Sequence, residues 1–359
     1  AGSPPTIPVL PLATEPLFGA STNEKPAMAL ALSVEFPTVG AQYRDATYSP
    51  ANEYLGYYDA EACYTYNNAP TETPRTGLTI QDYKRFDRTG AATARKCTGE
   101  QFSGNFLNWA SSSAMDMMRM ALSGGDRYID EANLTILQRA VLPAGDPFCF
   151  WNSGSYFPAK QLASTDGYSG AVPASMRTAA ASQNIWVANK LNQIYFRAAA
   201  SSTGTCSDSS GYTLGSGSWT PPAPGGGNTD GFFYSRVQVC NSSGSTLQDV
   251  RDYGLCKKYP NGYFKPTGAI QKYSDQLRLA AFGYLMDQTD PKTTGSTASF
   301  GGVLRAPMKY VGDKLFDISG QYSGNNPKAE WDQNTGQFIE NPEGNTTVQT
   351  TANVSSTGY

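Results

Sequence analysis

Apolar residues recur at three- and four-residue spacing most regularly between residues 103 and 127. This spacing places them on one face of a helix and leaves the polar residues largely on the other. Gly104-Asn105 can cap the start of that helix, and Gly124-Gly125 can end it because glycine adopts left-handed backbone angles easily. The pattern predicts a single amphipathic packing helix. Its apolar face comprises Phe106, Trp109, Ala110, Ala114, Met117, Met118, Ala121 and Leu122.

Short apolar runs elsewhere in the chain predict strands. Residues 27–36 form an apolar run that Pro37 ends, which predicts a buried strand, with a helix as the alternative that periodicity leaves open. Residues 232–240 form another candidate strand. Residues 278–285 are apolar on both faces, which predicts a central strand. In residues 303–311, Pro307 predicts an edge position or a bend, because proline cannot donate a hydrogen bond to a neighbouring strand.

Two further segments carry a mixed or helical pattern. Residues 129–142 form a second amphipathic segment that Pro143 ends, and residues 183–197 fit a short helix that runs into a strand. Strands that are separated by helices and joined by long loops predict a three-layer α/β domain.

Composition divides the chain into three parts. Residues 1–26 are rich in proline and predict an irregular, extended lead-in. Residues 27–320 hold the predicted elements and form one domain with insertions, among which the Ser/Gly/Thr/Pro-rich residues 198–231 predict a mobile loop. Residues 321–359 form a polar C-terminal segment that contains a predicted hairpin.

The overall charge and hydropathy narrow the class of protein. The net charge is −3 without a basic block, so nothing indicates binding to nucleic acid or to an anionic membrane surface. No apolar run approaches the roughly 18 residues that a membrane-spanning helix needs. Charged residues make up only 16% of the chain, while Gly and Tyr are abundant, which is typical of a loop-rich secreted protein. The first residues include neither Met nor a positive segment, so any signal peptide is expected to have been removed.

The six cysteines indicate that the protein resides in an oxidising compartment. None forms a Cys-x-x-Cys pair, and an even number in this composition predicts three disulfides. Among the fifteen possible connectivities, nearest-neighbour pairing is favoured because each bond would close a loop that is otherwise short of core. The alternative is free buried thiols. The predicted pairs are Cys63–Cys97, Cys149–Cys206 and Cys240–Cys256.

Histidine is absent, which excludes Ser-His-Asp and Cys-His catalytic systems and histidine-ligated metals. A carboxylate pair would be the remaining catalytic arrangement. No pair of Asp or Glu residues stands out, so the sequence favours a protein that acts by binding.

The segment 40–66 is rich in tyrosine, which favours recognition because a rigid, amphipathic ring provides contact area at small entropic cost. The alternative is that these rings pack loops over a core. The candidate recognition surface consists of Tyr43, Tyr48, Tyr54, Tyr57 and Tyr58.

One loop partly matches a calcium-binding pattern, with Asp332, Asn334 and Glu343 as candidate ligands. The glycine that the pattern needs is replaced by Gln337. A hairpin turn between Trp331 and Phe338 explains the same residues and is favoured. No cofactor is therefore expected in this region.

Several strings together identify a family. The most specific is Ser103-Gly-Asn-Phe-Leu-Asn-Trp109, and others lie at residues 32–37, 48–59, 63–66, 236–240, 256–266, 282–285, 301–305 and 329–332. In their order and spacing they resemble the N-terminal half of the PilC/PilY family of type IV pilus tip-associated adhesins and assembly factors. The resemblance implies a von Willebrand A-like three-layer core with long, disulfide-tied loop insertions. It also implies a C-terminal β-propeller, which this chain lacks. The metal-binding sequence of von Willebrand A domains is absent after the first strand, so metal-dependent adhesion is not expected.

The function implied by this resemblance is non-enzymatic. We expect a secreted adhesin and assembly factor that passes through the periplasm to the pilus tip. There it would contact minor pilins and support pilus biogenesis, attachment to host or abiotic surfaces, twitching motility and virulence. The alternatives are a secreted carboxylate-based glycan hydrolase and a purely structural factor that primes pilus assembly.

Overall fold

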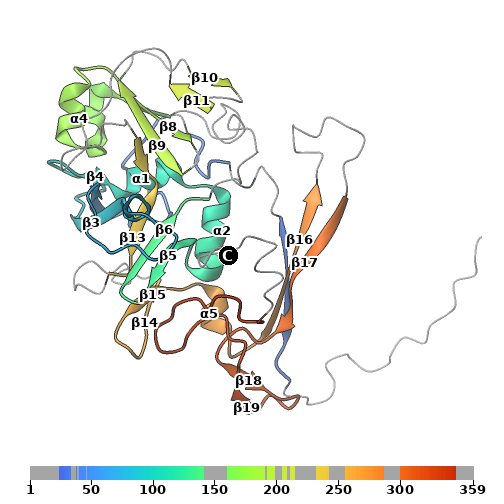
Figure 1. The fold of residues 1–359 in the computed structure, drawn as a ribbon. Coiled ribbons are helices and arrows are strands. Elements are labelled where there is room, and N and C mark those ends of the chain that lie inside the picture. Colours follow the sequence, from blue (N-terminus) through green and yellow to red (C-terminus); the bar gives the residue numbers. More distant parts are fainter. Residues whose placement is uncertain are drawn as a thin grey trace, which may run out of the picture.

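The computed structural model describes residues 24–33, 38, 40–45, 47–140, 160–190, 192–198, 204–207, 211–214, 232–241, 255–286 and 300–344. These residues form a mixed α/β structure with several sheets (Figure 1). The predicted lead-in before residue 24 and most of the predicted loop 198–231 lie outside them. No helix among the described residues is long and apolar enough to cross a membrane.

The largest sheet has six strands, and all of its neighbours are antiparallel except β3 and β13, which are parallel. It brings segments that are far apart in the sequence into one layer. Its order is β4 (Phe102–Ser103), β2 (Ala62–Asn67), β3 (Arg85–Ala91), β13 (Arg236–Val239), β6 (Leu134–Gln138) and β5 (Arg127–Glu131).

A second, fully antiparallel sheet has four strands. Their order is β12 (Phe232–Tyr234), β9 (Gln193–Ala198), β8 (Ile185–Lys190) and β7 (Lys160–Leu162). Two-stranded hairpins are formed by β10 (Gly204–Ser207) with β11 (Gly211–Leu214), β14 (Cys256–Lys258) with β15 (Phe264–Pro266), and β18 (Lys314–Phe316) with β19 (Tyr322–Asn325).

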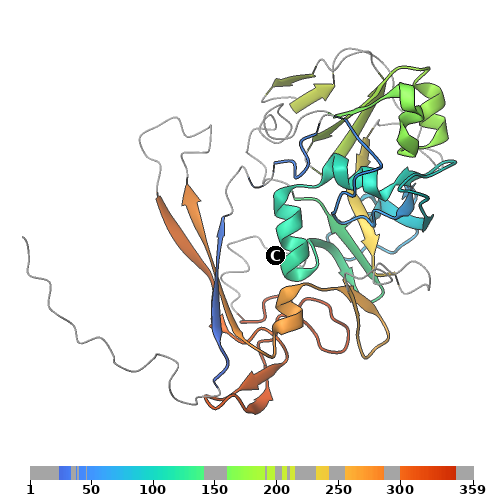
Figure 2. The ribbon, with the colours of Figure 1, turned by 180° about the vertical axis from the view of Figure 1, so that it is seen from behind.

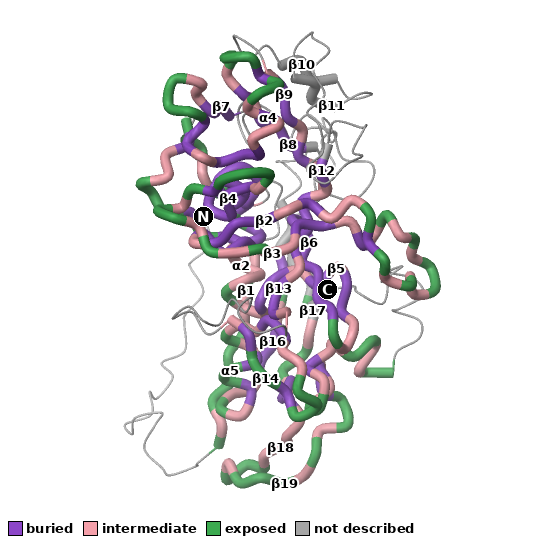
Figure 3. Tube along the Cα trace, turned by 90° about the vertical axis from the view of Figure 1, so that its left-hand side faces the viewer, coloured by how far each residue is buried: buried purple, intermediate pink, exposed green. Residues whose placement is uncertain are grey.

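The helices are short. They are α1 (Gly104–Ser111), α2 (Ala114–Ser123), α4 (Ala174–Ala179) and α5 (Ala269–Tyr273), with 3₁₀ turns η2 (Ile80–Tyr83) and η3 (Ser164–Gly170). Every residue of α1 is buried. The main hydrophobic cluster joins α1 to the inner faces of the six-stranded and four-stranded sheets, and Figure 3 shows the buried residues gathered there.

Aromatic rings dominate this core. Phe86 lies 5.3 Å from Phe102 and 6.0 Å from Phe233, while Phe106 lies 5.9 Å from Trp109, measured between ring centroids. Most contacts are edge-on or tilted, which is the geometry that the charge distribution of aromatic rings favours. Helix α1, the first part of the helix that the sequence predicts over residues 103–127, therefore lies at the centre of the core.

A third sheet stands beside this body in Figures 1 and 2, and it is formed by β1 (Ala27–Ser33), β16 (Arg278–Met286) and β17 (Phe300–Lys309). Strand β1 pairs in parallel with β16, although more than two hundred residues separate them in the sequence. As predicted, β16 is central and β17 is an edge strand. The register shifts where Leu279 and Ala281 face Lys309 and Ala306, and Pro307 lies within that irregularity.

The predicted single helix over residues 103–127 is wrong in one respect, because the structure divides it into α1 and α2. The Ser113 hydroxyl accepts a hydrogen bond from the Asp116 N–H, and the Asp116 carboxylate accepts from the Ser113 N–H and hydroxyl, which is a capping box. A second cap, Ser103, replaces the predicted Gly104-Asn105 cap at the start of α1. The predicted end holds, since Gly124 has a φ of 88°.

Two predicted helical segments are hairpins instead. Residues 129–142 contain the end of β5 and all of β6, whose residues are buried along the whole strand. Residues 183–197 contain β8 and most of β9, without a helix. In both places the strands β6, β8 and β9 each pair with another strand on either side, so tertiary pairing overrides the local helical spacing. The predicted strand 232–240 is interrupted at Ser235, where the chain passes from one sheet to the other.

Two of the predicted disulfides are formed, Cys63–Cys97 with a Cα–Cα distance of 5.7 Å and Cys240–Cys256 with 5.5 Å. The first ties β2 to the segment that enters β4 and α1. The second ties the end of β13 to the start of β14. The predicted Cys149–Cys206 bond lies outside the residues whose side chains the structure describes and stays a prediction.

Removing the first disulfide with the double variant Cys63→Ala/Cys97→Ala is expected to lower the free energy of unfolding by about 4 kcal/mol. The bond closes a loop of 34 residues, so its loss gives the unfolded chain more freedom. The matched variant Cys240→Ala/Cys256→Ala opens a separation of 16 residues and is expected to cost about 3 kcal/mol. Urea unfolding of the three proteins measures both values. Wild-type unfolding midpoints in both variants would show that the bonds add no stability.

Candidate functional site

Two asparagines on α1 hold the tyrosine-rich segment in place. The Asn108 side chain accepts a hydrogen bond from the Tyr58 N–H at 3.0 Å and donates to the carbonyl oxygens of Tyr54 and Tyr58 at 2.8 and 2.7 Å. One helical turn earlier, the Asn105 side chain accepts from the Tyr54 N–H at 2.7 Å and donates to the Asn52 carbonyl at 2.8 Å. Both asparagines are fully buried. The two asparagine side chains therefore fix the backbone of residues 52–58 on the helix.

Sequence reasoning missed this role, although a signal was present. The two asparagines stand three residues apart in an otherwise apolar helix, and buried polar side chains are almost always hydrogen-bonded. Gly56 lies between the clamped residues, and a Cβ atom there would come within 2.3 Å of the Asn108 Oδ1 and Ser112 Oγ atoms. The loop approaches α1 so closely that only glycine fits.

The tyrosines proposed as a recognition surface are packing residues instead. Tyr48, Tyr54, Tyr57 and Tyr58 are buried, with 3–6% of each residue exposed. The ring of Tyr48 lies 5.5 Å from that of Trp109. Only Tyr43 is half-buried; its hydroxyl donates to the Leu55 carbonyl, and its ring lies 4.9 Å from that of Tyr54. The rings pack against the apolar residues of α1 and are shielded from solvent, so the predicted recognition surface is not formed.

A buried lysine also faces α1. The Lys160 ammonium donates to the Trp109 carbonyl oxygen and lies 4.7 Å from the centroid of the Trp109 ring. Burial lowers the pKa of this lysine to about 7, and the positive charge of Arg139 acts in the same direction. These contacts join β7 to the helix.

A buried charge centre joins β5 to two distant segments. The Asp130 carboxylate lies 3.0 Å from the Arg127 guanidinium and 2.9 Å from the Lys265 ammonium, and it accepts from the Phe338 N–H at 2.8 Å. The Arg127 guanidinium also donates to the carbonyl oxygens of Gly336 and Pro266. Burial alone would raise the pKa of Asp130, but the two cations outweigh it and hold that pKa below its usual range.

The candidate calcium ligands are not brought together. The Asp332 carboxylate accepts from the N–H groups of Asn334 and Thr335 within the turn, and Trp331 pairs with Phe338 as the hairpin alternative predicts. Glu343 instead forms ion pairs with Lys309 and Lys328. The favoured hairpin turn is therefore formed, and the calcium site stays a prediction without support from this arrangement. No cluster of three or more Cys, Asp or Glu residues within the described ranges can hold a metal ion.

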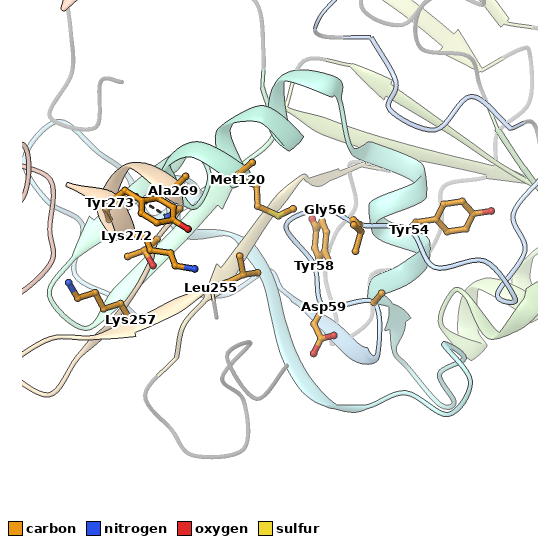
Figure 4. A pocket seen from close by; sticks show the side chains of 16 residues that line it. Tyr54, Gly56, Tyr58, Asp59, Met120, Leu255, Lys257, Ala269, Lys272 and Tyr273 are labelled. Carbon is orange, nitrogen blue, oxygen red and sulfur yellow. Dashed lines mark hydrogen bonds between the residues drawn. The ribbon is translucent and has the colours of Figure 1, made fainter. Parts of the chain in front are cut away.

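A cleft of about 880 Å³ lies between residues 54–60 of the tyrosine-rich segment, α2, and the segment from Leu255 to α5 (Figure 4). Gly56, Tyr58 and Met120 lie at one end of it. Lys257, Lys272 and Tyr273 lie at the other, with Leu255 between. Sequence reasoning missed this cleft because its walls come from three distant segments.

Comparison with known proteins gives a consistent result. A family model described as the small alpha/beta domain of the PilY1 homolog matches residues 45–198. A type IV pilus biogenesis factor PilY1 homolog from Xylella fastidiosa is 31% identical over 333 residues, which are 92% of this chain and 24% of that protein. Another PilY1 homolog from the same organism is 26% identical over 298 residues, or 77% of this chain and 18% of that protein. No solved structure matches.

The chain thus spans about a quarter or less of the length of these curated relatives. The matched domain contains residues 45–66 of the tyrosine-rich segment, the Ser103-Gly-Asn-Phe-Leu-Asn-Trp109 string and the Cys63–Cys97 bond. The family resemblance of the sequence is confirmed, since the chain carries the small alpha/beta domain of the PilY1 homologues over residues 45–198.

Proposed function

We propose that this chain is part of a type IV pilus biogenesis factor that acts by binding and not by catalysis. The observation that carries the proposal is its similarity, over 92% of its residues, to a protein named as such a factor. Two disulfides fit an extracellular or periplasmic site of action. The buried carboxylates Asp116 and Asp130 are each held by backbone N–H groups, which suits structural roles.

Within that role, we propose an adhesin and assembly factor at the pilus tip. It would be secreted through the periplasm and contact minor pilins, and it would support attachment to surfaces and twitching motility. The family resemblance and the two disulfides support this finer role.

Deleting the gene tests both levels of the proposal. Loss of surface pili, of twitching zones and of adherence is expected, with recovery on complementation. Normal piliation, twitching and adherence in the deletion strain would contradict the proposal. When pili are restored by blocking their retraction, a remaining adherence defect supports adhesion at the tip. Full adherence would instead assign the protein to pilus priming alone.

We also propose that the β1–β16–β17 sheet belongs to a von Willebrand A-like three-layer core that spans residues 27–320, with the small alpha/beta domain as an insertion. The parallel pairing of β1 with β16 supports this, because parallel strands need a crossover connection, and the residues between these two strands include the matched small alpha/beta domain. Strand β1 is apolar on both faces but mostly exposed, and Met28 is 42% and Leu304 64% exposed. Such a sheet needs further cover.

An experimental structure of a chain as long as the curated relatives tests this core. Helices packed on both faces of β1–β16–β17 are expected. A sheet that stays uncovered, or one covered by an antiparallel sheet, would contradict the three-layer arrangement.

A further inference from the structure

We infer that the cleft between the tyrosine-rich segment, α2 and α5 binds an acidic peptide that carries apolar side chains. The proposal stands on the cleft itself. It holds whether or not the protein acts at the pilus tip.

The cleft is preformed because its walls are locked together. The Gln271 side chain accepts from the Gly268 N–H at 2.9 Å and donates to the Ser123 carbonyl at 3.0 Å, which fixes α5 against the end of α2. A Cβ atom at Gly268 would come within 2.4 Å of the Leu122 backbone, so the two helices touch. The opposite wall is the loop that Asn108 clamps. A rigid cleft loses little conformational entropy when a partner binds.

The charge of the cleft is positive. Lys257 and Lys272 are exposed, and neither ammonium has a carboxylate partner among the described residues; each lies near a neighbouring tyrosine ring, Tyr259 and Tyr273 respectively. Asp59 also lines the cleft, but its carboxylate accepts from the Glu61 N–H and pairs with Arg88 at 3.4 Å. The lysine charges are therefore not cancelled, although the chain as a whole is acidic. A carboxylate-bearing partner complements this end of the cleft.

The rest of the cleft selects for apolar side chains. Met120, Ala121 and Leu255 line it, and Leu55 and Tyr273 are 39% and 40% exposed at its walls. The Gln271 amide is already hydrogen-bonded within the protein. A glycan would need several available polar partners. A phosphate group can pair with the two lysines but leaves the apolar part of the cleft unfilled. A peptide with alternating apolar and acidic residues matches both ends, and a volume of about 880 Å³ suits a short segment.

Selection of random peptides, about twelve residues long and displayed on phage, tests the proposal on the full chain. Peptides that combine Asp or Glu with Leu, Met or Phe are expected to be enriched. Their dissociation constants, measured by fluorescence anisotropy, are expected to rise about tenfold or more in Lys257→Glu/Lys272→Glu, and to rise with salt. Ala121→Trp fills the cleft and should also abolish binding.

Lys84→Glu serves as the matched control, since Lys84 lies outside the cleft, and it should bind like the wild type. Lys257 and Lys272 are exposed, so Lys257→Glu/Lys272→Glu should keep the wild-type melting temperature. Enriched peptides without acidic residues, or equal affinity for wild type and the double variant, would overturn the proposal. The proposal would also be overturned if no peptide bound and the protein instead bound glycans on an array, provided that Ala121→Trp removed the glycan binding. The cleft would then be a carbohydrate site.

Discussion

Replacing Asn108 by leucine is expected to lower the free energy of unfolding by about 5 kcal/mol, which is enough to unfold a marginally stable domain. Leucine has a similar shape but leaves the Tyr58 N–H and the carbonyl oxygens of Tyr54 and Tyr58 without partners in the core. Each buried group without a partner costs about 1–3 kcal/mol. Urea unfolding followed by circular dichroism measures the loss.

Asn68→Leu provides the control, because Asn68 is only half-buried and lies outside the clamp. Its unfolding midpoint should stay near that of the wild type. Asn108→Asp gives a second test. The carboxylate can still accept from Tyr58 but cannot donate to the two carbonyl oxygens, so a large loss is again expected. If Asn108→Leu and Asn68→Leu unfold at the same urea concentration, the clamp does not hold the fold.

The role expected of Asn108 indicates that the residues of the family string stabilise the fold. Ser103-Gly-Asn-Phe-Leu-Asn-Trp109 identifies the family, yet each of its residues is buried and its side chains cap, pack or clamp. Gly104 is part of this fit, because a Cβ atom there would come within 2.1 Å of the Asp59 carbonyl oxygen. The string is therefore a folding signature. Variants in it are expected to impair pilus function through loss of the domain and not through loss of a contact surface.

The sequence predicted correctly those elements that are determined by residues close together in the chain. Apolar runs and proline stops predict the strands β1, β16 and β17 of the third sheet. Glycine and aspartate turn chemistry predicts the end of α2 at Gly124 and the turn at Asp332. The disulfides Cys63–Cys97 and Cys240–Cys256 follow from nearest-neighbour spacing. These features depend on a few adjacent residues or on short loops.

Other features depend on what packs against a segment. Residues 134–138 have helical spacing, but they pair with β13 on one side and with β5 on the other. All five residues are also buried, so a strand forms. The break between α1 and α2 had a local signal, since Ser113 and Asp116 have the spacing of a capping box. This signal was overlooked because the helical spacing of apolar residues continues across it from residue 106 to residue 122. The cleft had no local signal, because Gly56, Met120 and Leu255 meet only in the fold.

Asp130→Asn is expected to lower the free energy of unfolding by about 4 kcal/mol at neutral pH. The variant keeps the shape of the side chain but leaves the buried cations Arg127 and Lys265 facing a neutral amide. Removing one partner of a buried ion pair is costly because the remaining charge stays desolvated. Segments as distant as Lys265 and Phe338 meet at this carboxylate, so the loss should spread to the β14–β15 hairpin and the 331–338 turn.

The pH dependence gives this prediction its sharpest test. Since the folded state holds the pKa of Asp130 below the value in the unfolded chain, the stability that the carboxylate contributes is present above the unfolded pKa of about 3.9. It is lost as the pH falls through the folded pKa. The difference between wild type and Asp130→Asn should therefore be largest between about pH 5 and 8 and should shrink below about pH 4. Glu340→Gln, at an exposed position beside the same turn, should show no such difference at any pH. A gap that stays constant from pH 7 to pH 3 would mean that the amide acts through its shape or packing, and not through the missing charge.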